Sequence, residues 1–460
     1  MQKLRFKVES AKIQKVSLGQ FRLWQTIVQT VQAHGLQYFI SSIWHSRFIQ
    51  IMTISEQWHT FTAAPHRVMF LGGALQSIAV MLWLLVEMAT RYGVAGHPMD
   101  WSILPGAVHG YLMVFGLFPF LIFGFLMTTY PRWMNGKEIP ARRYVPAFVL
   151  LMLGAAGFYA GLMTGRIVLL AAVFATLAGW GAALYALLRV LLDAQHPDKR
   201  HPQIIFIALS MGWCSLAAYL VWLWGDNAAW LRFSIQGGLC FFLLPVFASV
   251  AHRMIPFFTS TALPQHLVAR PYWAWWVMLA AGVTHGLLQL ADAAAWLWLC
   301  DLPLAFAALY LTHAWGLRRS LGIPMLGVLH IGFAWLGIAM LLSGAQSSVL
   351  FLSGGTMFIW GLAPLHALTV GCFATLLIGM GTRVTLGHSG LPMRADTPIR
   401  LMFIGIQLAA VLRVLADMLP VSITHWLYFA AAVVWLACFV PWVSRYLPVY
   451  WKPRADGKPG

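Results

Sequence analysis

The stretch VHGYLMVFGLFPFLIFGFLMTTY, residues 108–130, contains no Asp, Glu, Lys or Arg. An α-helix rises 1.5 Å per residue, so about 20 apolar residues cross the roughly 30 Å of hydrocarbon in a bilayer. The stretch therefore predicts a membrane-spanning helix. Other apolar runs of similar length lie at roughly 68–90, 145–164, 167–190, 203–224, 230–251, 272–291, 293–315, 325–345, 357–381, 399–417 and 425–444.

The composition of the whole chain agrees with this pattern. Of its 460 residues, 60% are hydrophobic and 9% are charged, whereas soluble proteins carry about 25% charged residues. A soluble protein this apolar would expose large hydrophobic patches, whereas a bilayer covers them. We therefore expect an all-α membrane protein with about twelve transmembrane helices.

The basic residues predict how these helices are oriented. The net charge is +17, with 30 Lys and Arg against 13 Asp and Glu. If the N-terminus is cytoplasmic, only Arg91, Arg166, Arg232 and Arg413 lie on the outer side, and the other 26 face the cytoplasm. Cytoplasmic loops are rich in Lys and Arg, so we expect both termini in the cytoplasm of a bacterial inner-membrane protein. Because these charges alternate with apolar runs, they indicate contact with the lipid bilayer and argue against nucleic acid.

The chain divides into one helical domain and two tails. Residues 1–65 begin with several Lys and Arg and lack the compact apolar core of a signal peptide, so they predict a basic cytoplasmic tail. Residues 66–446 make up the predicted twelve-helix transmembrane domain. Residues 447–460 predict a short basic cytoplasmic tail.

Acidic and cysteine side chains exclude several classes of function. Glu87, Asp292, Asp301 and Asp417 lie at or near the ends of the predicted spans. This argues against an ion pump built on carboxylates within the membrane. The five cysteines form no CxxC pair, so neither a zinc ribbon nor a covalent c-type haem site is expected.

Histidine is the residue type that indicates chemistry. The chain has 16 histidines, and several lie within apolar runs, where an ionisable residue is costly and is a functional candidate by default. Imidazole is a common ligand of haem iron and also suits copper. By depth along the helices, the outer candidates are His109, His285 and His366, and the inner candidates are His252, His330 and His388. For any single one, the alternative is a hydrogen-bonded histidine of the protein core.

The segment PLHALTVGCFATLLIGMGTRVTLGHSG, residues 364–390, is the most distinctive. Its two histidines, His366 and His388, would lie about 33 Å apart along one helix, so they cannot share a site. Small residues follow His366 and permit the close approach of a helix or a porphyrin. Arg383 could pair with a haem propionate, or it could simply mark the cytoplasmic end of the helix.

Four stretches together resemble the NnrS family of haem- and copper-containing membrane proteins associated with nitric oxide. They are His366–Gly390, His109–Gly136, His252–Ser260 and Leu329–Trp335, and the similarity covers residues of about 66–400. The chain departs from the family where His109 is followed by Gly110 and Tyr111 in place of Glu and Met. It also departs where Leu391 stands in place of a basic residue after the His388 turn.

The resemblance implies haem b as a cofactor, copper as a second one, and nitric oxide or a similar small gas as the ligand. On this interpretation His109, His366, His285 and Arg383 bind the haem, and His252, His330 and His388 bind a metal. The protein would support nitric oxide tolerance or denitrification. If it is a haem or haem-copper redox enzyme, its electron donor is a separate protein, because the sequence contains no soluble redox domain.

Two other classes of protein remain as alternatives. A transporter or accessory protein that handles copper or haem would have the same outline, and the 21 methionines suit copper, although Met is also ordinary core filler. A terminal haem-copper oxidase is disfavoured, because the chain has no adjacent His–His pair.

Overall fold

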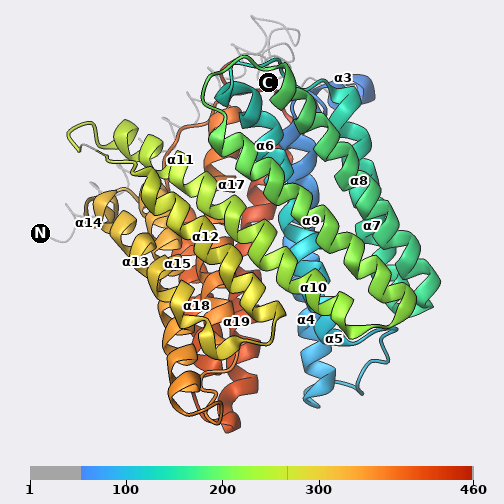
Figure 1. Ribbon diagram of the computed structural model, residues 1–460. Helices are drawn as coiled ribbons and strands as arrows, with labels where there is room; N and C mark the ends of the chain where they lie inside the picture. Colours follow the sequence, from blue (N-terminus) through green and yellow to red (C-terminus); the bar gives the residue numbers. More distant parts are fainter. Residues whose placement is uncertain (1–52, 267, 458–460) are drawn as a thin grey trace, which may run out of the picture. The chain divides into compact units, whose positions relative to one another are not determined.

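The computed structural model describes residues 53–266 and 268–457, and the chain falls into two parts, residues 1–57 and 58–460. Most of the predicted N-terminal tail, residues 1–65, therefore lies outside the described residues. The second part is helical, and no strand occurs among the described residues (Figure 1). The all-α prediction is confirmed.

The helices form three successive blocks of four. Residues 65–193 contain α4 (Pro65–Arg91), then α5 (Pro105–Tyr111), η1 (Leu112–Leu117) and α6 (Phe118–Trp133) as one continuous helix, then α7 (Ala141–Thr164) and α8 (Arg166–Asp193). Residues 200–314 contain α9 (Arg200–Gly225), then α10 (Ala228–Gly237), η2 (Gly238–Leu243) and α11 (Leu244–Ala262), also continuous, then α12 (Tyr272–Leu290) and α13 (Trp298–Ala314).

The third block begins at residue 324. It contains α15 (Pro324–Leu352), then α16 (Ala363–His366), η4 (Ala367–Ala374) and α17 (Thr375–His388) as one continuous helix, then α18 (Thr397–Ala416) and α19 (Val421–Tyr446). Short elements complete the described chain: α3 (Ile54–Phe61), η3 (Ala294–Trp296), α14 (Leu317–Ser320) and η5 (Leu447–Trp451).

Ten helices of the described chain are long and apolar enough to cross a membrane. The remaining pair, α12 and α13, has 19 and 17 residues and packs as neighbours in the bundle. Counting this pair gives the predicted twelve. The chain is thus a multi-pass membrane protein.

Local sequence explains where several of these helices end. Asp226 follows α9 with φ of 55° and Asp292 follows α12 with φ of 57°. Asp is among the few residues that adopt the left-handed conformation readily, and this conformation stops a helix. Proline marks the beginning of two other helices. Both α5 and α16 carry a proline in their first two positions, where the missing N–H is not needed for a hydrogen bond within the helix.

The second helix of each block is special in two ways. It contains the π-helical segment of that block, namely η1, η2 or η4. These three continuous helices are also the most deeply buried of the ten spans. They meet around a small apolar cavity of about 70 Å³, which Leu121, Val246 and Leu376 help to line.

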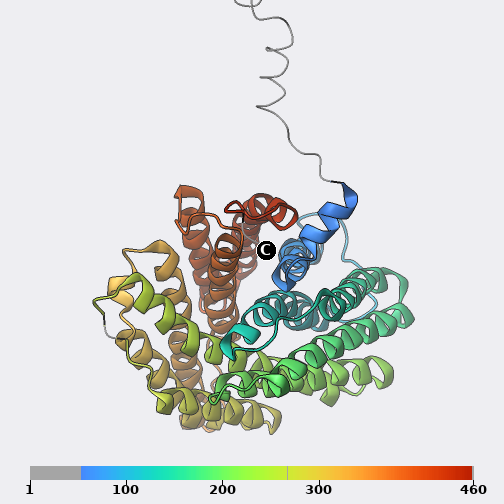
Figure 2. The same ribbon diagram turned by 90° about the horizontal axis from the view of Figure 1, so that it is seen from above.

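The blocks follow one another around the bundle. Seen from above, the colours run from blue through green and yellow to red, and the last block returns to the first (Figure 2). Contacts between α19 and α4 close this arrangement. The end of the chain takes part as well, because Arg67 of α4 donates hydrogen bonds to the carbonyls of Tyr450 and Lys452. The segment predicted as a C-terminal tail therefore packs on the helical domain.

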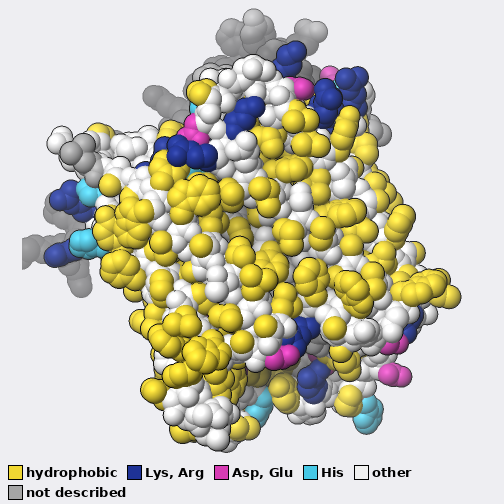
Figure 3. Space-filling model, viewed as in Figure 1, with side chains coloured by type: hydrophobic (Ala, Val, Ile, Leu, Met, Phe, Trp, Pro, Cys, Tyr) yellow, Lys and Arg dark blue, Asp and Glu magenta, His cyan; other side chains and the backbone are white. Residues whose placement is uncertain are grey.

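The surface shows which faces suit lipid. Hydrophobic side chains cover the middle of the visible face, and Lys and Arg gather near its upper and lower ends (Figure 3). Large apolar side chains such as Leu153, Phe174 and Ile404 are more than half exposed. Such a belt between charged ends is the pattern that a bilayer requires.

Candidate functional site

A cavity of about 400 Å³ lies between the first and third blocks, with η2 of the second block on one side. His109 of α5 and His366 of α16 both line it. Most of the lining is apolar, including Met113, Leu239 and Trp435. A large apolar pocket with a few polar groups is the usual form of a cofactor site.

The backbone around this cavity is unusual. His109 lies three residues before η1, and His366 directly precedes η4. The third π-helical segment, η2, contributes Leu239 and Leu243 to the same cavity. Short π-helical segments are rare and occur frequently at functional sites. All three of those in the described chain border this one cavity, which singles it out from the rest of the bundle.

The two histidines differ in how their ring nitrogens are satisfied. His366 Nδ1 lies 3.0 Å from the carbonyl oxygen of Leu362, so it is assigned as the protonated nitrogen and Nε2 is free to bind a ligand. A backbone carbonyl in this position fixes the ring of a metal-binding histidine. His109 Nδ1 is buried and has no hydrogen-bond partner among the described residues.

Two arginines add positive charge at the cavity. Arg413 Nη1 lies 2.8 Å from Asp417 Oδ2, and its guanidinium lies 4.2 Å from the centre of the Tyr428 ring. Arg91 pairs with Glu87, which also accepts a hydrogen bond from the Trp101 indole. The cavity thus presents cations beside its apolar walls.

Sequence reasoning placed Arg91 and Arg413 on the outer side of the membrane but assigned them no role. Their outer position could have indicated a role, because few basic residues are expected on the outer side of a membrane protein. The other two of that group pair with exposed loop acids: Arg166 with Asp226, and Arg232 with Asp292. Arg91 and Arg413 are ion-paired as well, with Glu87 and Asp417, but they line the cavity and are therefore the ones to consider for ligand binding.

The other two residues predicted to bind haem lie elsewhere. His285 contacts Asp301 and does not line the cavity. Arg383 donates a hydrogen bond to the Met325 carbonyl at 2.9 Å and lies 4.1 Å from the Phe258 ring centre. Of the four, only His109 and His366 line the same cavity.

The three histidines predicted to bind a metal each have a different neighbour. His252 Nδ1 lies 3.0 Å from His201 Nε2, and His330 Nε2 lies 2.9 Å from Thr259 Oγ1. The rings of His388 and His66 have centres 4.6 Å apart. The structure therefore shows separate pairs in place of one inner cluster, and two of the partners, His66 and His201, were not among the predicted site residues.

Comparison with known proteins agrees with the resemblance seen in the sequence. The family model described as NnrS protein matches residues 60–454. The match covers the whole described bundle from α4 to η5, including every residue that lines the cavity. No curated protein matches the chain.

Proposed function

The chain belongs to the NnrS family, and we propose from this that it is a haem b protein of the bacterial inner membrane that binds nitric oxide. Family membership supports a role in the response to nitric oxide. The role in tolerance or denitrification and the haem itself are part of the proposal. The observation that carries it is the cavity shared by His109 and His366.

The residues present fit a haem. An iron porphyrin needs an apolar slot, an imidazole ligand and cations for its propionates. The walls supply the slot, His366 offers a free Nε2, and the buried Nδ1 of His109 lacks a partner. Arg91 and Arg413 would hold the propionates, since guanidinium groups pair well with carboxylates.

The iron would supply the binding site for nitric oxide, and the protein would control access to it. Nitric oxide is small and neutral, so it dissolves in apolar surroundings. Phe118 lines the large cavity, and its ring packs against Phe247, which lines the small apolar cavity at the centre of the bundle. Phe373 stacks on Phe247 with ring centres 4.4 Å apart, and we infer that these three rings form a partition between the two spaces. A gas molecule could wait in the central cavity behind these rings.

The test is the visible spectrum of the detergent-purified protein, oxidised and reduced, with a pyridine haemochrome. We expect a b-type spectrum that shifts when nitric oxide is added. His366→Gly and His109→Gly should each change the spectrum, and imidazole in solution should restore it. The control is His330→Ala, which removes a buried histidine outside the cavity.

Two results would overturn the proposal. One is a colourless protein from haem-replete cells that takes up no added haem. The other is loss of the spectrum in His330→Ala with retention in both cavity variants. The alternative function, transport or handling of copper or haem, predicts that bound haem or metal passes on to an acceptor protein. Stable retention of haem in the presence of an apo-acceptor would disfavour it.

A further inference from the structure

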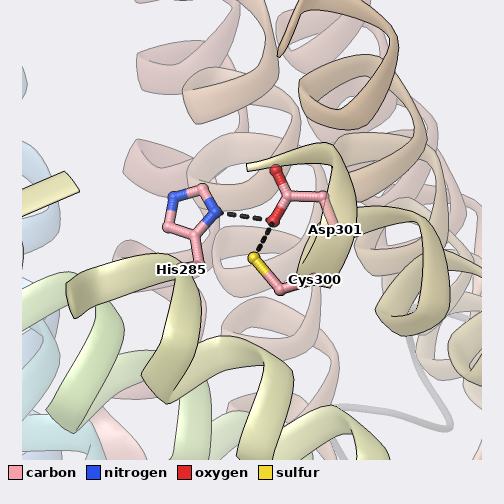
Figure 4. Close-up of side chains that lie close together, drawn as sticks. All are labelled: His285, Cys300 and Asp301. Carbon is pink, nitrogen blue, oxygen red and sulfur yellow. Dashed lines mark hydrogen bonds and ion pairs between the residues drawn. The ribbon is translucent and has the colours of Figure 1, made fainter. Parts of the chain in front are cut away.

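A second group of reactive side chains lies where α12, α13 and α15 meet. His285 Nδ1 is 2.7 Å from Asp301 Oδ1, and Cys300 Sγ is 3.6 Å from the same oxygen. Figure 4 shows the imidazole on one helix facing the carboxylate and the thiol on the next. The nitrogen, sulfur and oxygen ligand atoms all lie within 4.8 Å of one another. Asp301 is fully buried, and the His285 side chain is 14% exposed.

A fourth group approaches from η2. Cys240 packs against Gly286, the residue after His285, so closely that a methyl group on Gly286 would lie 2.8 Å from the Cys240 Cβ. The Cys240 thiol is near enough to interact electrostatically with both Asp301 and Cys300. The absence of a side chain at Gly286 therefore leaves room for both Cys240 and Phe241 to pack against α12.

The electrostatics of this cluster favour a cation. A buried carboxylate is unfavourable by several kcal/mol unless it is paired. Within the described chain, Asp301 accepts hydrogen bonds only from neutral or weakly basic groups, namely His285, the Cys300 thiol and, at 2.6 Å, the Ser343 hydroxyl. Among the described residues no Lys or Arg forms an ion pair with Asp301. The cluster can therefore accept positive charge.

The other buried histidine pairs lack this property. Neither His66 with His388 nor His201 with His252 has a thiol or carboxylate within hydrogen-bond distance of its imidazole nitrogens among the described residues. Both pairs lie in the field of cations, which are Arg67, Arg132 and Arg454 at the first and Arg253 and Arg270, partly offset by Asp198, at the second. These pairs would repel a metal ion, so the electrostatic argument selects the cluster at His285.

We propose that Cys240, His285, Cys300 and Asp301 form a binding site for copper or zinc. Thiolate and imidazole ligands suit both metals, and a carboxylate is an accepted fourth ligand of zinc. With metal–ligand bonds of about 2.0–2.3 Å, tetrahedral ligands lie about 3.3–3.8 Å apart. The His285, Cys300 and Asp301 ligand atoms, now within 4.8 Å of one another, need shifts of about 1 Å to reach that spacing, which side-chain rotation provides.

The site is distinct from the large cavity but shares an element with it. Leu239 and Leu243 of η2 line the cavity, whereas Cys240 faces the metal-binding group. The two sites therefore lie on different sides of one helix, whose diameter is about 10 Å. The proposal does not depend on haem binding, since no haem ligand belongs to the group.

The experiment uses the full chain in detergent, reduced and stripped of metal with a chelator, and titrated with Co²⁺ as a spectroscopic probe. We expect one equivalent to bind with the thiolate-to-cobalt absorption and the intense visible bands of a tetrahedral site. Added Zn²⁺ or Cu⁺ should displace it. Cys300→Ser and His285→Asn should abolish these bands, and Asp301→Asn should weaken Co²⁺ binding about 10- to 100-fold.

The matched control is Cys372→Ser, because Cys372 is also a buried cysteine of a π-helical segment but lies outside the group. It should bind Co²⁺ as the unaltered chain does. Absence of the bands, or their persistence in Cys300→Ser, would overturn the proposal.

If the variants do not fold, X-ray absorption of the unaltered chain loaded with Zn²⁺ decides the matter. Sulfur neighbours at about 2.3 Å support the site. A shell of nitrogen and oxygen alone contradicts it.

Discussion

Arg413 offers the sharpest test of the large cavity. Its side chain is 16% exposed, and one of its nitrogens is held 2.8 Å from Asp417, which leaves the rest of the guanidinium beside the cavity. A hydrogen bond to a charged group contributes about 1.5–3 kcal/mol. If Arg413 binds a propionate, Arg413→Gln should raise the haem dissociation constant about 10- to 150-fold, because 1.4 kcal/mol corresponds to a factor of ten. Because Arg413 is little exposed, solvent screening should reduce the contribution of its hydrogen bond only slightly.

The assay measures the rate at which haem leaves the purified protein for an apo-globin acceptor. The band positions should stay as they were, because the imidazole ligands are untouched. Arg166→Gln is the control: Arg166 pairs with Asp226, is 40% exposed and does not line the cavity. Asp417→Asn removes the ion pair with Arg413 but keeps the guanidinium, so it reports the effect of that ion pair alone. An unchanged rate in Arg413→Gln, or an equal change in Arg166→Gln, would refute the assignment.

Three further predictions address access, packing and pH. Phe118→Ala should open the partition between the two cavities and speed nitric oxide binding, as measured by flash photolysis; an unchanged rate would exclude this route. Gly154→Ala should lower the melting temperature in detergent, because its Cβ would collide with Thr176 Oγ1 and lie 2.8 Å from Thr176 N; equal stability would contradict the close packing of α7 on α8. Hydrogen bonds from Arg200 hold the pKa of Asp198 well below its usual range. Asp198 therefore stabilises the fold at neutral pH, and this contribution is lost as the pH falls through the usual Asp range towards the lowered pKa. Asp198→Asn should flatten the acid limb of the thermal stability profile, and an unchanged limb would count against it.

The sequence was sufficient to predict the bundle and the outer position of His109 and His366, which line one cavity in the structure. Both follow from one-dimensional quantities: the length of apolar runs, and the depth of a residue along a helix of known rise. Depth cannot tell which helices are neighbours. His285 has a comparable depth, but α12 carries it away from the cavity and towards α13.

Asp301 shows a second limit of the sequence. Its position near the end of an apolar run suggested a residue close to the membrane surface. In the structure α13 begins at Trp298, so Asp301 is in its first turn, and α15 covers it with Ser343. Burial here depends on a helix that is distant in sequence. The threefold order of the blocks was also missed, because the π-helical segments that mark it are backbone features that the pattern of apolar residues does not indicate.

The three π-helical segments have a consequence for how such a cavity can arise. A π-helical turn holds one residue more than an α-helical turn, so it is equivalent to a single-residue insertion that the helix absorbs without breaking. Residues on either side of η1, η2 and η4 are thereby rotated by about 100° relative to an uninterrupted helix. Deleting one residue from any of these segments would restore a regular helix and turn one half of the span away from its neighbours. The bundle can be regarded as an ordinary set of packed helices in which three one-residue insertions, at one level, create room for a ligand.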